Sequence, residues 1–157
     1  MASVQISREE MLKRVAHFKE LKPIDYKAMG MGYVPQGMEG FSLIGQVAKA
    51  IAPTITGEHG FTVGLAKVSP GKGSPPHSHT TVEVFVPLSG KWVFTWGAKG
   101  NEEEIMLEAW DTISFPQGVM HGFRNLSDQD AYFLAILGGP EVGEITYAPE
   151  VLEKATP

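Results

Sequence analysis

Two histidines and a glutamate lie close together within residues 71–90. His77, His79 and Glu83 all occupy odd-numbered positions, and alternate residues of a β-strand point to the same face. We therefore expect the three side chains to project from one face of a single strand. Neutral imidazole and ionised carboxylate suit iron, manganese, nickel, zinc and copper. This stretch indicates a metal site, and His121 is the candidate for a further ligand.

The composition is that of a single globular domain. The chain has 157 residues, of which 43% are hydrophobic and 20% are charged, as in ordinary soluble proteins. A formal charge of −5 without any basic run argues against nucleic acid or an anionic membrane as the main partner. Because cysteine is absent, a metal must be held by histidine and carboxylate. The first residues lack the features of a signal peptide and no stretch is long enough to span a bilayer, so we expect a cytoplasmic protein.

The segment before residue 61 is expected to flank the main domain. Ser7 and Glu10 have the spacing of a capping box, and apolar residues at helical spacing predict a helix over residues 8–20, ended by Pro23. Residues 24–60 are rich in Gly, Pro and Met and predict an irregular arm with one or two short strands, at the apolar stretches 41–44 and 47–51. We expect residues 1–60 to pack on the main domain or on a partner subunit.

From residue 61 onward the pattern changes to short strands separated by turns. Apolar runs alternate with clusters of Gly, Pro and Asn, as in an all-β sandwich or barrel. Strands are expected at residues 61–68, 82–88, 92–96, 103–107, 112–115 and 131–137, and a turn is expected over residues 69–76. We expect the barrel to span residues 61–147. A short helix should follow within residues 148–157, beginning at Pro149 with Glu150 in its first turn.

The predicted strand that contains Glu83 is apolar on both faces. Val82, Val84 and Val86 alternate with Glu83 and Phe85. A strand face exposed to water is usually polar, so a second apolar face implies a cover. The N-terminal segment or a second subunit could supply that cover, and we favour a homodimer.

The histidines and glutamate lie in patterns that resemble the two sequence motifs of the cupin superfamily. The first motif is present in full as Gly71-x5-His77-x-His79-x3-Glu83-x6-Gly90, and most of the second as Pro116-x-Gly118-x2-His121-x3-Asn125. So many positions at fixed spacing are far more specific than an isolated His-x-His. The resemblance implies a double-stranded β-helix, or jelly-roll barrel. It also implies one metal bound inside the barrel by His77, His79, Glu83 and His121.

The implied site points to catalysis. Three imidazoles and one carboxylate leave two positions of an octahedron open, and we expect one divalent transition metal, with Fe(II) favoured over Mn(II), Ni(II) or Zn(II). The leading hypothesis is an oxygenase that acts on a small aromatic or apolar molecule, with Glu83 as a candidate base. The alternatives are a metal-dependent isomerase, lyase or decarboxylase, or a barrel that binds a small molecule without converting it.

The lining of the cavity is expected to be largely apolar. Phe85 and Phe123 each lie two residues from a proposed ligand, on the face that should point inward, and Asn125 shares this parity. These three residues are the candidate substrate pocket. Trp92, Phe94 and Trp96 also alternate, which is more typical of core or interface packing than of a substrate site.

One position departs from the second motif. Trp110 stands where that motif usually has glycine, six residues before Pro116. Glycine is favoured where a turn requires a positive φ angle. The substitution predicts an altered turn at the rim of the barrel and leaves the metal ligands unaffected.

Overall fold

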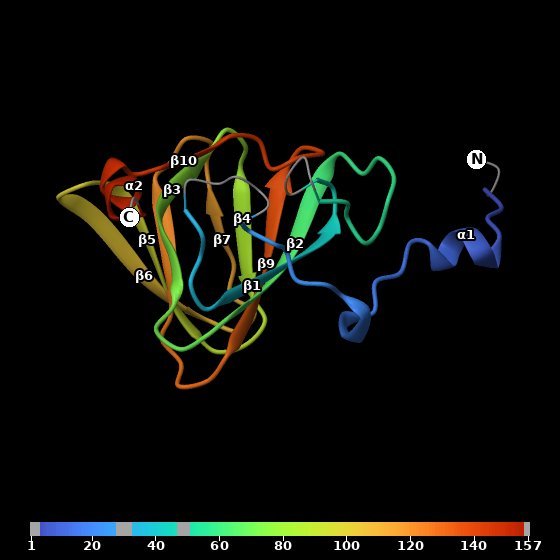
Figure 1. Cartoon of the computed structure of the whole chain (residues 1–157), viewed down its shortest axis with the longest axis horizontal. Coiled ribbons are helices and arrows are strands. Elements are labelled where there is room, and N and C mark those ends of the chain that lie inside the picture. The colour runs from blue at the N-terminus through green and yellow to red at the C-terminus, as the bar shows by residue number, and fades with distance from the viewer. Residues whose placement is uncertain (1–3, 28–32, 47–50, 156–157) are drawn as a thin grey trace.

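The computed structural model describes residues 4–27, 33–46 and 51–155, and its body consists of two five-stranded antiparallel sheets (Figure 1). The first sheet contains, in spatial order, β1 (Met38–Ile44), β2 (Phe61–Val68), β9 (Ala131–Gly138), β4 (Glu83–Pro87) and β7 (Ile113–Phe115). The second contains β10 (Ile145–Tyr147), β3 (Gly73–His79), β8 (His121–Asn125), β5 (Lys91–Ala98) and β6 (Asn101–Glu108). Consecutive strands from β2 to β5, and again from β6 to β10, alternate between the sheets. This winding confirms the predicted all-β jelly-roll barrel.

Aromatic side chains fill the space between the two sheets. Phe85 is almost completely buried, and its ring centroid lies 5.3 Å from that of Phe94 and 5.2 Å from that of Phe133. Trp92 joins the same cluster, 5.2 Å from Phe133. Each such side chain contributes roughly 2–3 kcal/mol when fully buried. The alternating aromatic residues of β5 therefore face inward, which confirms that they are core residues.

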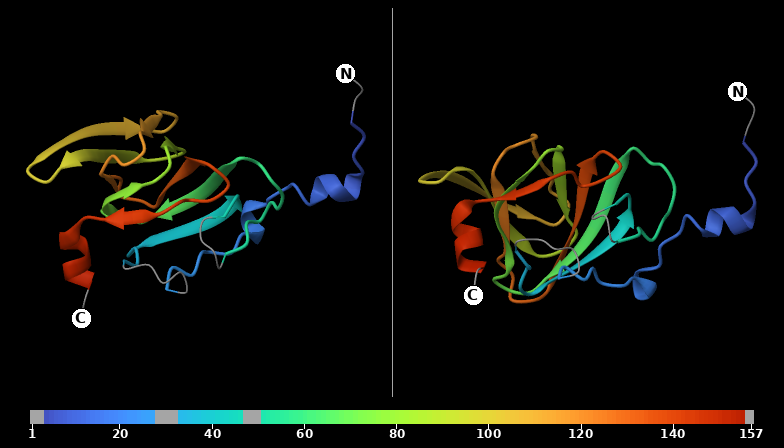
Figure 2. Two further views of the ribbon diagram at one scale, coloured as in Figure 1. Left: turned by 90° about the horizontal axis from the view of Figure 1, so that it is seen from above. Right: turned by 45° about the horizontal axis from the view of Figure 1, so that its top comes forward.

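The N-terminal helix begins where expected and ends early. The Ser7 hydroxyl accepts a hydrogen bond from the Glu10 N–H at 3.2 Å, as in a capping box. Helix α1 spans only Arg8–Leu12, and a 3-10 turn, η1, follows at Phe18–Glu20, so the helix predicted over residues 8–20 is wrong in length. None of its residues is buried, and it extends away from the sheets (Figure 2). A helix without a packed apolar face gains little tertiary stabilisation, which accounts for its short length.

The arm supplies one complete strand of the barrel. Strand β1 pairs with β2 from Met38 opposite Val68 to Ile44 opposite Val63. The short strand predicted near residues 41–44 is confirmed, and most of the second stretch, residues 47–51, lies outside the described residues. Of the described residues before β1, Phe18 makes ring contacts with this sheet, at centroid distances of 6.0 Å from Phe41 and 5.9 Å from Tyr132.

The last described element is the short helix α2 (Pro149–Ala155), which begins at the predicted proline. Glu150 lies in its first turn and approaches Lys99 of the turn between β5 and β6, with Nζ and Oε2 separated by 3.9 Å. No helix in the described part of the chain is long and apolar enough to cross a membrane.

Trp110 keeps the backbone conformation that glycine usually provides. Its φ angle is 75°, and its side chain is 76% exposed. The Trp110 N–H donates to the Pro87 carbonyl at 2.8 Å, and Asp111 Oδ2 accepts from the Glu108 N–H at 2.8 Å. The turn predicted to be altered thus retains the left-handed conformation, at a cost of about 1–2 kcal/mol for a residue with a Cβ atom.

Candidate metal centre

Strand β3 carries His77 and His79 at its carboxyl end. Both side chains are buried, with 6% exposure each, because alternate residues of the strand face the barrel interior. The two prolines before His77 have no N–H to pair with β8, and the register between the strands shifts between Ser74 and His77. A bulged strand therefore occupies residues that the sequence predicted to be part of a turn.

Glu83 lies on a different strand from the two histidines, so the prediction of a single strand is wrong. It is the first residue of β4, in the opposite sheet. Residues 80–82 connect β3 to β4 and so cross from one sheet to the other. Two hydrogen bonds hold this connection: the Thr80 hydroxyl accepts from the Glu144 N–H at 3.0 Å, and the Thr80 N–H donates to the Glu144 carbonyl at 3.2 Å. The crossing nevertheless brings Glu83 Oε2 to 3.1 Å from His79 Nε2.

His121 is the first residue of β8 and lies directly opposite His77 in the antiparallel pair β3–β8. Its side chain is 2% exposed. The imidazole stacks on Phe115, with a centroid distance of 4.3 Å and an interplanar angle of 8°. Its Nδ1 atom lies 2.8 Å from the Val119 carbonyl. Packing and hydrogen bonding thus fix the ring before any ligand binds.

The four side chains converge on one point. His77, His79, Glu83 and His121 each offer one ligand atom, and these atoms all lie within 4.8 Å of one another. Nδ1 of His77 lies 2.9 Å from the Pro75 carbonyl, and Nδ1 of His121 contacts the Val119 carbonyl. A carbonyl oxygen can only accept, so both Nδ1 atoms carry the proton. In the neutral imidazoles Nε2 then bears the lone pair that a metal requires.

The carboxylate at the centre of the cluster faces two imidazole nitrogens. Glu83 Oε2 lies 3.0 Å from His121 Nε2 as well as 3.1 Å from His79 Nε2. A carboxylate and an imidazole lone pair repel each other unless a proton or a metal ion lies between them. Nδ1 of His79 is the one fully buried side-chain polar atom in the described residues that has no hydrogen-bond partner. Of the two ring nitrogens of His79, Nε2 is therefore the one that faces the cluster and can bind a metal.

The protonation states favour metal binding. Burial, followed by the charge of His121, lowers the pKa of His77 to about 4. In the metal-free protein a proton takes the place of the metal ion between Glu83 and each of these imidazoles. Burial raises the pKa of Glu83, but the hydrogen bonds that His121 and His79 then donate outweigh this effect and lower it to about 2. At neutral pH His77 is therefore neutral and Glu83 is ionised. Three imidazoles and one carboxylate fit a divalent transition metal.

An apolar cavity of about 120 Å³ adjoins the cluster, with His77, His79 and Glu83 in its wall. Two of the predicted pocket residues, Phe85 and Phe123, line it. Their side chains come from opposite sheets, and their ring centroids are 5.4 Å apart.

The third predicted pocket residue, Asn125, is placed elsewhere. Its side chain is fully buried, and its Nδ2 atom donates to the Val68 and Gln129 carbonyls at 2.9 Å each. Its Oδ1 atom accepts from the Ser127 N–H at 2.8 Å. All of these contacts tie down the loop after β8, and Asn125 is not among the described residues that line the cavity. Shared strand parity alone did not place it in the pocket.

Several residues that line the cavity were missed from the sequence. Ala135 and Leu137 of β9 follow the inward alternation of a predicted strand, so the periodicity could have identified them. Tyr26 lies in the arm and Tyr147 on β10. No local pattern marks either tyrosine, because both reach the cavity through tertiary packing.

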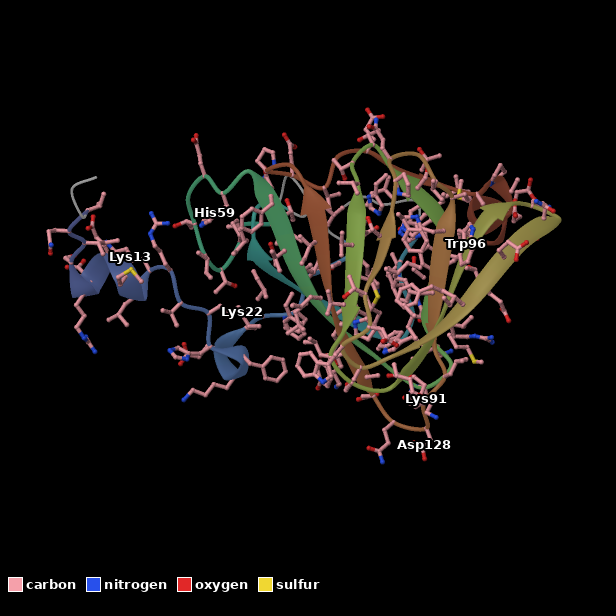
Figure 3. All side chains as sticks on the ribbon, turned by 180° about the vertical axis from the view of Figure 1, so that it is seen from behind. Lys13, Lys22, His59, Lys91, Trp96 and Asp128 are labelled. Carbon is pink, nitrogen blue, oxygen red and sulfur yellow. The ribbon has the colours of Figure 1, made fainter. Side chains whose placement is uncertain are left out.

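The two histidines outside the cupin-like motifs lie apart from the cluster. His17 is exposed beside η1. His59 lies in the loop before β2 (Figure 3), where its Nδ1 atom contacts the Gly57 carbonyl at 3.0 Å. His59 therefore offers a control position for experiments on the cluster.

The central part of the barrel matches a known family. Residues 64–137 fit the family model described as the cupin domain. The barrel is a cupin domain. The four clustered side chains are those to which the motif resemblance assigned the metal, so the cupin contains a buried group of three histidines and one glutamate that fits a divalent metal.

Proteins of known structure with the same fold are described as enzymes of several different activities. The polyketide cyclase RemF from Streptomyces resistomycificus is 22% identical, with a TM-score of 0.64 over 88% of this chain and 89% of RemF. An oxalate oxidase is 21% identical, with a TM-score of 0.60 over 80% of this chain and 62% of the oxidase. Oxalate decarboxylase from Bacillus subtilis is 20% identical, with a TM-score of 0.61 over 87% of this chain and 34% of the decarboxylase.

Similarity at this level of identity shows the fold alone. This cupin spans less than two thirds of the oxalate oxidase and about a third of the decarboxylase, at 62% and 34% coverage. No curated protein matches its sequence.

Proposed function

We propose that this cupin is a metal-dependent enzyme, specifically an oxygenase that acts on a small aromatic or apolar molecule. The observation that carries the proposal is the convergence of four buried ligand atoms within 4.8 Å at the wall of an apolar cavity. Buried titratable groups gathered beside a cavity are the usual arrangement of an active site. The ligands are His77, His79, Glu83 and His121, and the favoured metal is Fe(II).

The side chains of the cluster have distinct roles in this proposal. A bound transition metal would supply a Lewis acid and, as iron, a redox centre. His77 and His121 are held by backbone carbonyls, which keeps their Nε2 atoms directed at the cluster. Glu83, whose pKa is lowered to about 2, is a weak proton acceptor in the metal-free protein. The low pKa therefore favours a role of Glu83 as a metal ligand over its proposed role as a base.

The cavity supports an apolar substrate. Phe85, Phe123 and Leu137 contribute hydrophobic surface beside the ligands. Such a lining excludes water and favours a small organic molecule over a hydrated ion.

The proposal is tested by loading the protein with Fe(II) without oxygen and then measuring oxygen uptake with phenolic, diketone and thiol substrates. Uptake that is lost in His121→Ala and kept in His59→Ala would support an oxygenase. If the loaded protein consumes no oxygen with any of these substrates, the oxygenase proposal fails.

A redox-neutral reaction is the second candidate. The ligand set also suits Mn(II), Ni(II) or Zn(II), and RemF, which has nearly the same length as this chain, is described as a cyclase. Conversion of a substrate without oxygen uptake would favour an isomerase, lyase or decarboxylase. Substrate binding without conversion would favour a binding protein.

We also propose a homodimer in which the outer face of the first sheet is covered. Val84 pairs with Ile136 and Val86 with Leu134, and these half-buried side chains form an apolar band. Val82 beside it is 41% exposed. Helix α1 of the same chain has no buried residue, and the proposed cover is a second copy, including the N-terminal segment of that copy.

Light scattering across a range of protein concentrations tests the homodimer. Ile136→Glu should give monomers, because it buries a charge in the proposed interface. Met106→Glu, at a position 74% exposed on the other sheet, is the matched control. A monomeric parent protein, or dissociation caused by Met106→Glu alone, would contradict this interface.

A further inference from the structure

Three tyrosines lie near the metal centre. Tyr147 lies opposite His77 in the pair β10–β3, with ring centroids 5.7 Å apart. Tyr33 of the arm packs on Tyr147 at a centroid distance of 5.4 Å. Tyr26 and Tyr147 both line the cavity. Two chain segments far apart in the sequence thus place phenol groups next to the metal ligands.

Two of these phenol groups make no hydrogen bond to another residue in the described part of the chain. The Tyr33 hydroxyl interacts with the backbone of Gln36. The hydroxyls of Tyr26 and Tyr147 have no partner among the described residues. Both tyrosines are half-buried, and a tyrosine hydroxyl in such a position can donate to a molecule that enters the cavity. Both groups are therefore available to a bound molecule.

The fold makes room for one of them. A Cβ atom at Gly40 of β1 would overlap the Tyr26 hydroxyl. Glycine at this position thus allows the phenol to lie against the strand. Burial, and the nearby Tyr147, raise the pKa of Tyr26, so its hydroxyl remains a neutral donor.

The cavity offers no positive side chain. Apart from the metal ligands, the polar side chains in its lining are Tyr26, Tyr147 and Ser74. The Ser74 hydroxyl is already engaged, at 3.2 Å from His77 Nδ1. No lysine or arginine among the described residues lines the cavity, and the labelled Lys13 and Lys22 lie in the N-terminal segment (Figure 3). A dianionic substrate would add charge beside ionised Glu83 without a side chain to balance it.

The volume of the cavity limits the ligand. An engineered apolar cavity of about 150 Å³ in another protein binds benzene. The cavity of about 120 Å³ found here therefore suits a molecule of one ring or smaller.

We propose that Tyr26 and Tyr147 form a hydrogen-bonding subsite that selects an uncharged, ring-sized substrate with two oxygen functions. One oxygen meets the metal cluster and the other accepts from the tyrosines. The inference rests on the proposed function for the role of the metal, but the tyrosine subsite can be tested separately from it.

Calorimetric titration of the Zn(II)-loaded protein with two probes tests the subsite. Resorcinol and 3-methylphenol differ only in a hydroxyl or a methyl group at the second position. Tyr26→Phe and Tyr147→Phe should weaken resorcinol binding about three- to tenfold, the effect of one hydrogen bond, and leave 3-methylphenol unchanged. Gly40→Ala should act like Tyr26→Phe by displacing the phenol. Tyr132→Phe, on the opposite face of β9, is the matched control.

Thermal unfolding of each variant checks that it is folded. Equal affinities of the parent protein for the two probes, or no binding of either, would overturn the proposal. The proposal would also be overturned if the variants lost affinity for both probes equally, or if the parent protein bound the charged analogue 3-hydroxybenzoate more tightly than resorcinol. Zinc content is measured on the same samples. Absence of zinc from the parent protein would refute the proposed function, whereas a preference for resorcinol in metal-free protein would still support the subsite.

Discussion

Replacing Glu83 by Gln should change how the metal-free protein responds to acid. Glu83 is 5% exposed, and its Oε2 atom lies 3.0 Å from His121 Nε2 and 3.1 Å from His79 Nε2. These contacts overcome the effect of burial and lower its pKa from 4.5 to about 2. The difference corresponds to about 3 kcal/mol of folding free energy at neutral pH.

Proton uptake by the unfolded chain sets the direction of the effect. As the pH falls from 4.5 towards 2, the unfolded chain binds a proton at Glu83 that the folded protein does not bind. The stability contributed by the carboxylate is therefore fully present above this range and is lost as the pH decreases through it. Glu83→Gln has no such proton to bind. It should be less stable than the parent protein at neutral pH and lose less stability on acidification.

Urea unfolding in the presence of a chelator, at neutral pH and near pH 3, measures both effects. The difference in unfolding free energy between the parent protein and Glu83→Gln should be about 3 kcal/mol at neutral pH and should shrink in acid. Glu58→Gln, at an exposed position in the loop before β2, is the control. The reasoning is refuted if the difference is the same at both pH values, or if Glu58→Gln reproduces it.

Three further substitutions test the barrel by chemical denaturation. Trp110→Gly should be more stable than Trp110→Ala by about 0.5–1 kcal/mol, because both remove the indole and only glycine relieves the positive φ angle. Gly118→Ala, at a φ angle of 78° with open space around it, should be less stable than the parent protein by a similar amount. Equal stabilities of Trp110→Gly and Trp110→Ala would show that residue 110 is not strained. Asn125→Ala should cost about 2–4 kcal/mol through its lost hydrogen bonds without changing metal content, and a loss of metal would show that Asn125 belongs to the site. Phe85→Ala should cost about 3–5 kcal/mol as a core truncation, and a cost below about 1 kcal/mol would show that its packing is loose.

The sequence predicted those strands whose alternation is strong. The strand expected at residues 61–68 is β2, and the strand expected at residues 131–137 is β9 with one more residue. Strand β3 was taken as a turn as far as residue 76 because glycine and two adjacent prolines are typical of turns. Pairing with β8 holds that segment as a bulged strand instead.

The metal ligands could be found from the sequence, whereas their arrangement could not. Fixed spacing identified all four residues, but Glu83 was assigned to the strand of His77 and His79. A crossing between sheets depends on contacts such as that of Thr80 with Glu144, which are distant in the sequence. The predicted helix was too long for a related reason, because Met11, Leu12 and Val15 of its apolar stripe are exposed and do not pack on the sheets. The cytoplasmic location and the homodimer stay predictions.

Metal content is the most direct test of the central claim. The purified protein is incubated with Fe(II) or Zn(II), freed of unbound metal and subjected to elemental analysis. We expect about one ion per chain in the parent protein and in His59→Ala, and almost none in His79→Ala and His121→Ala, because one buried cluster supplies all four ligands. A parent protein that retains no metal, or a His121→Ala variant that retains a full complement, would contradict the assignment of this cluster as the metal centre.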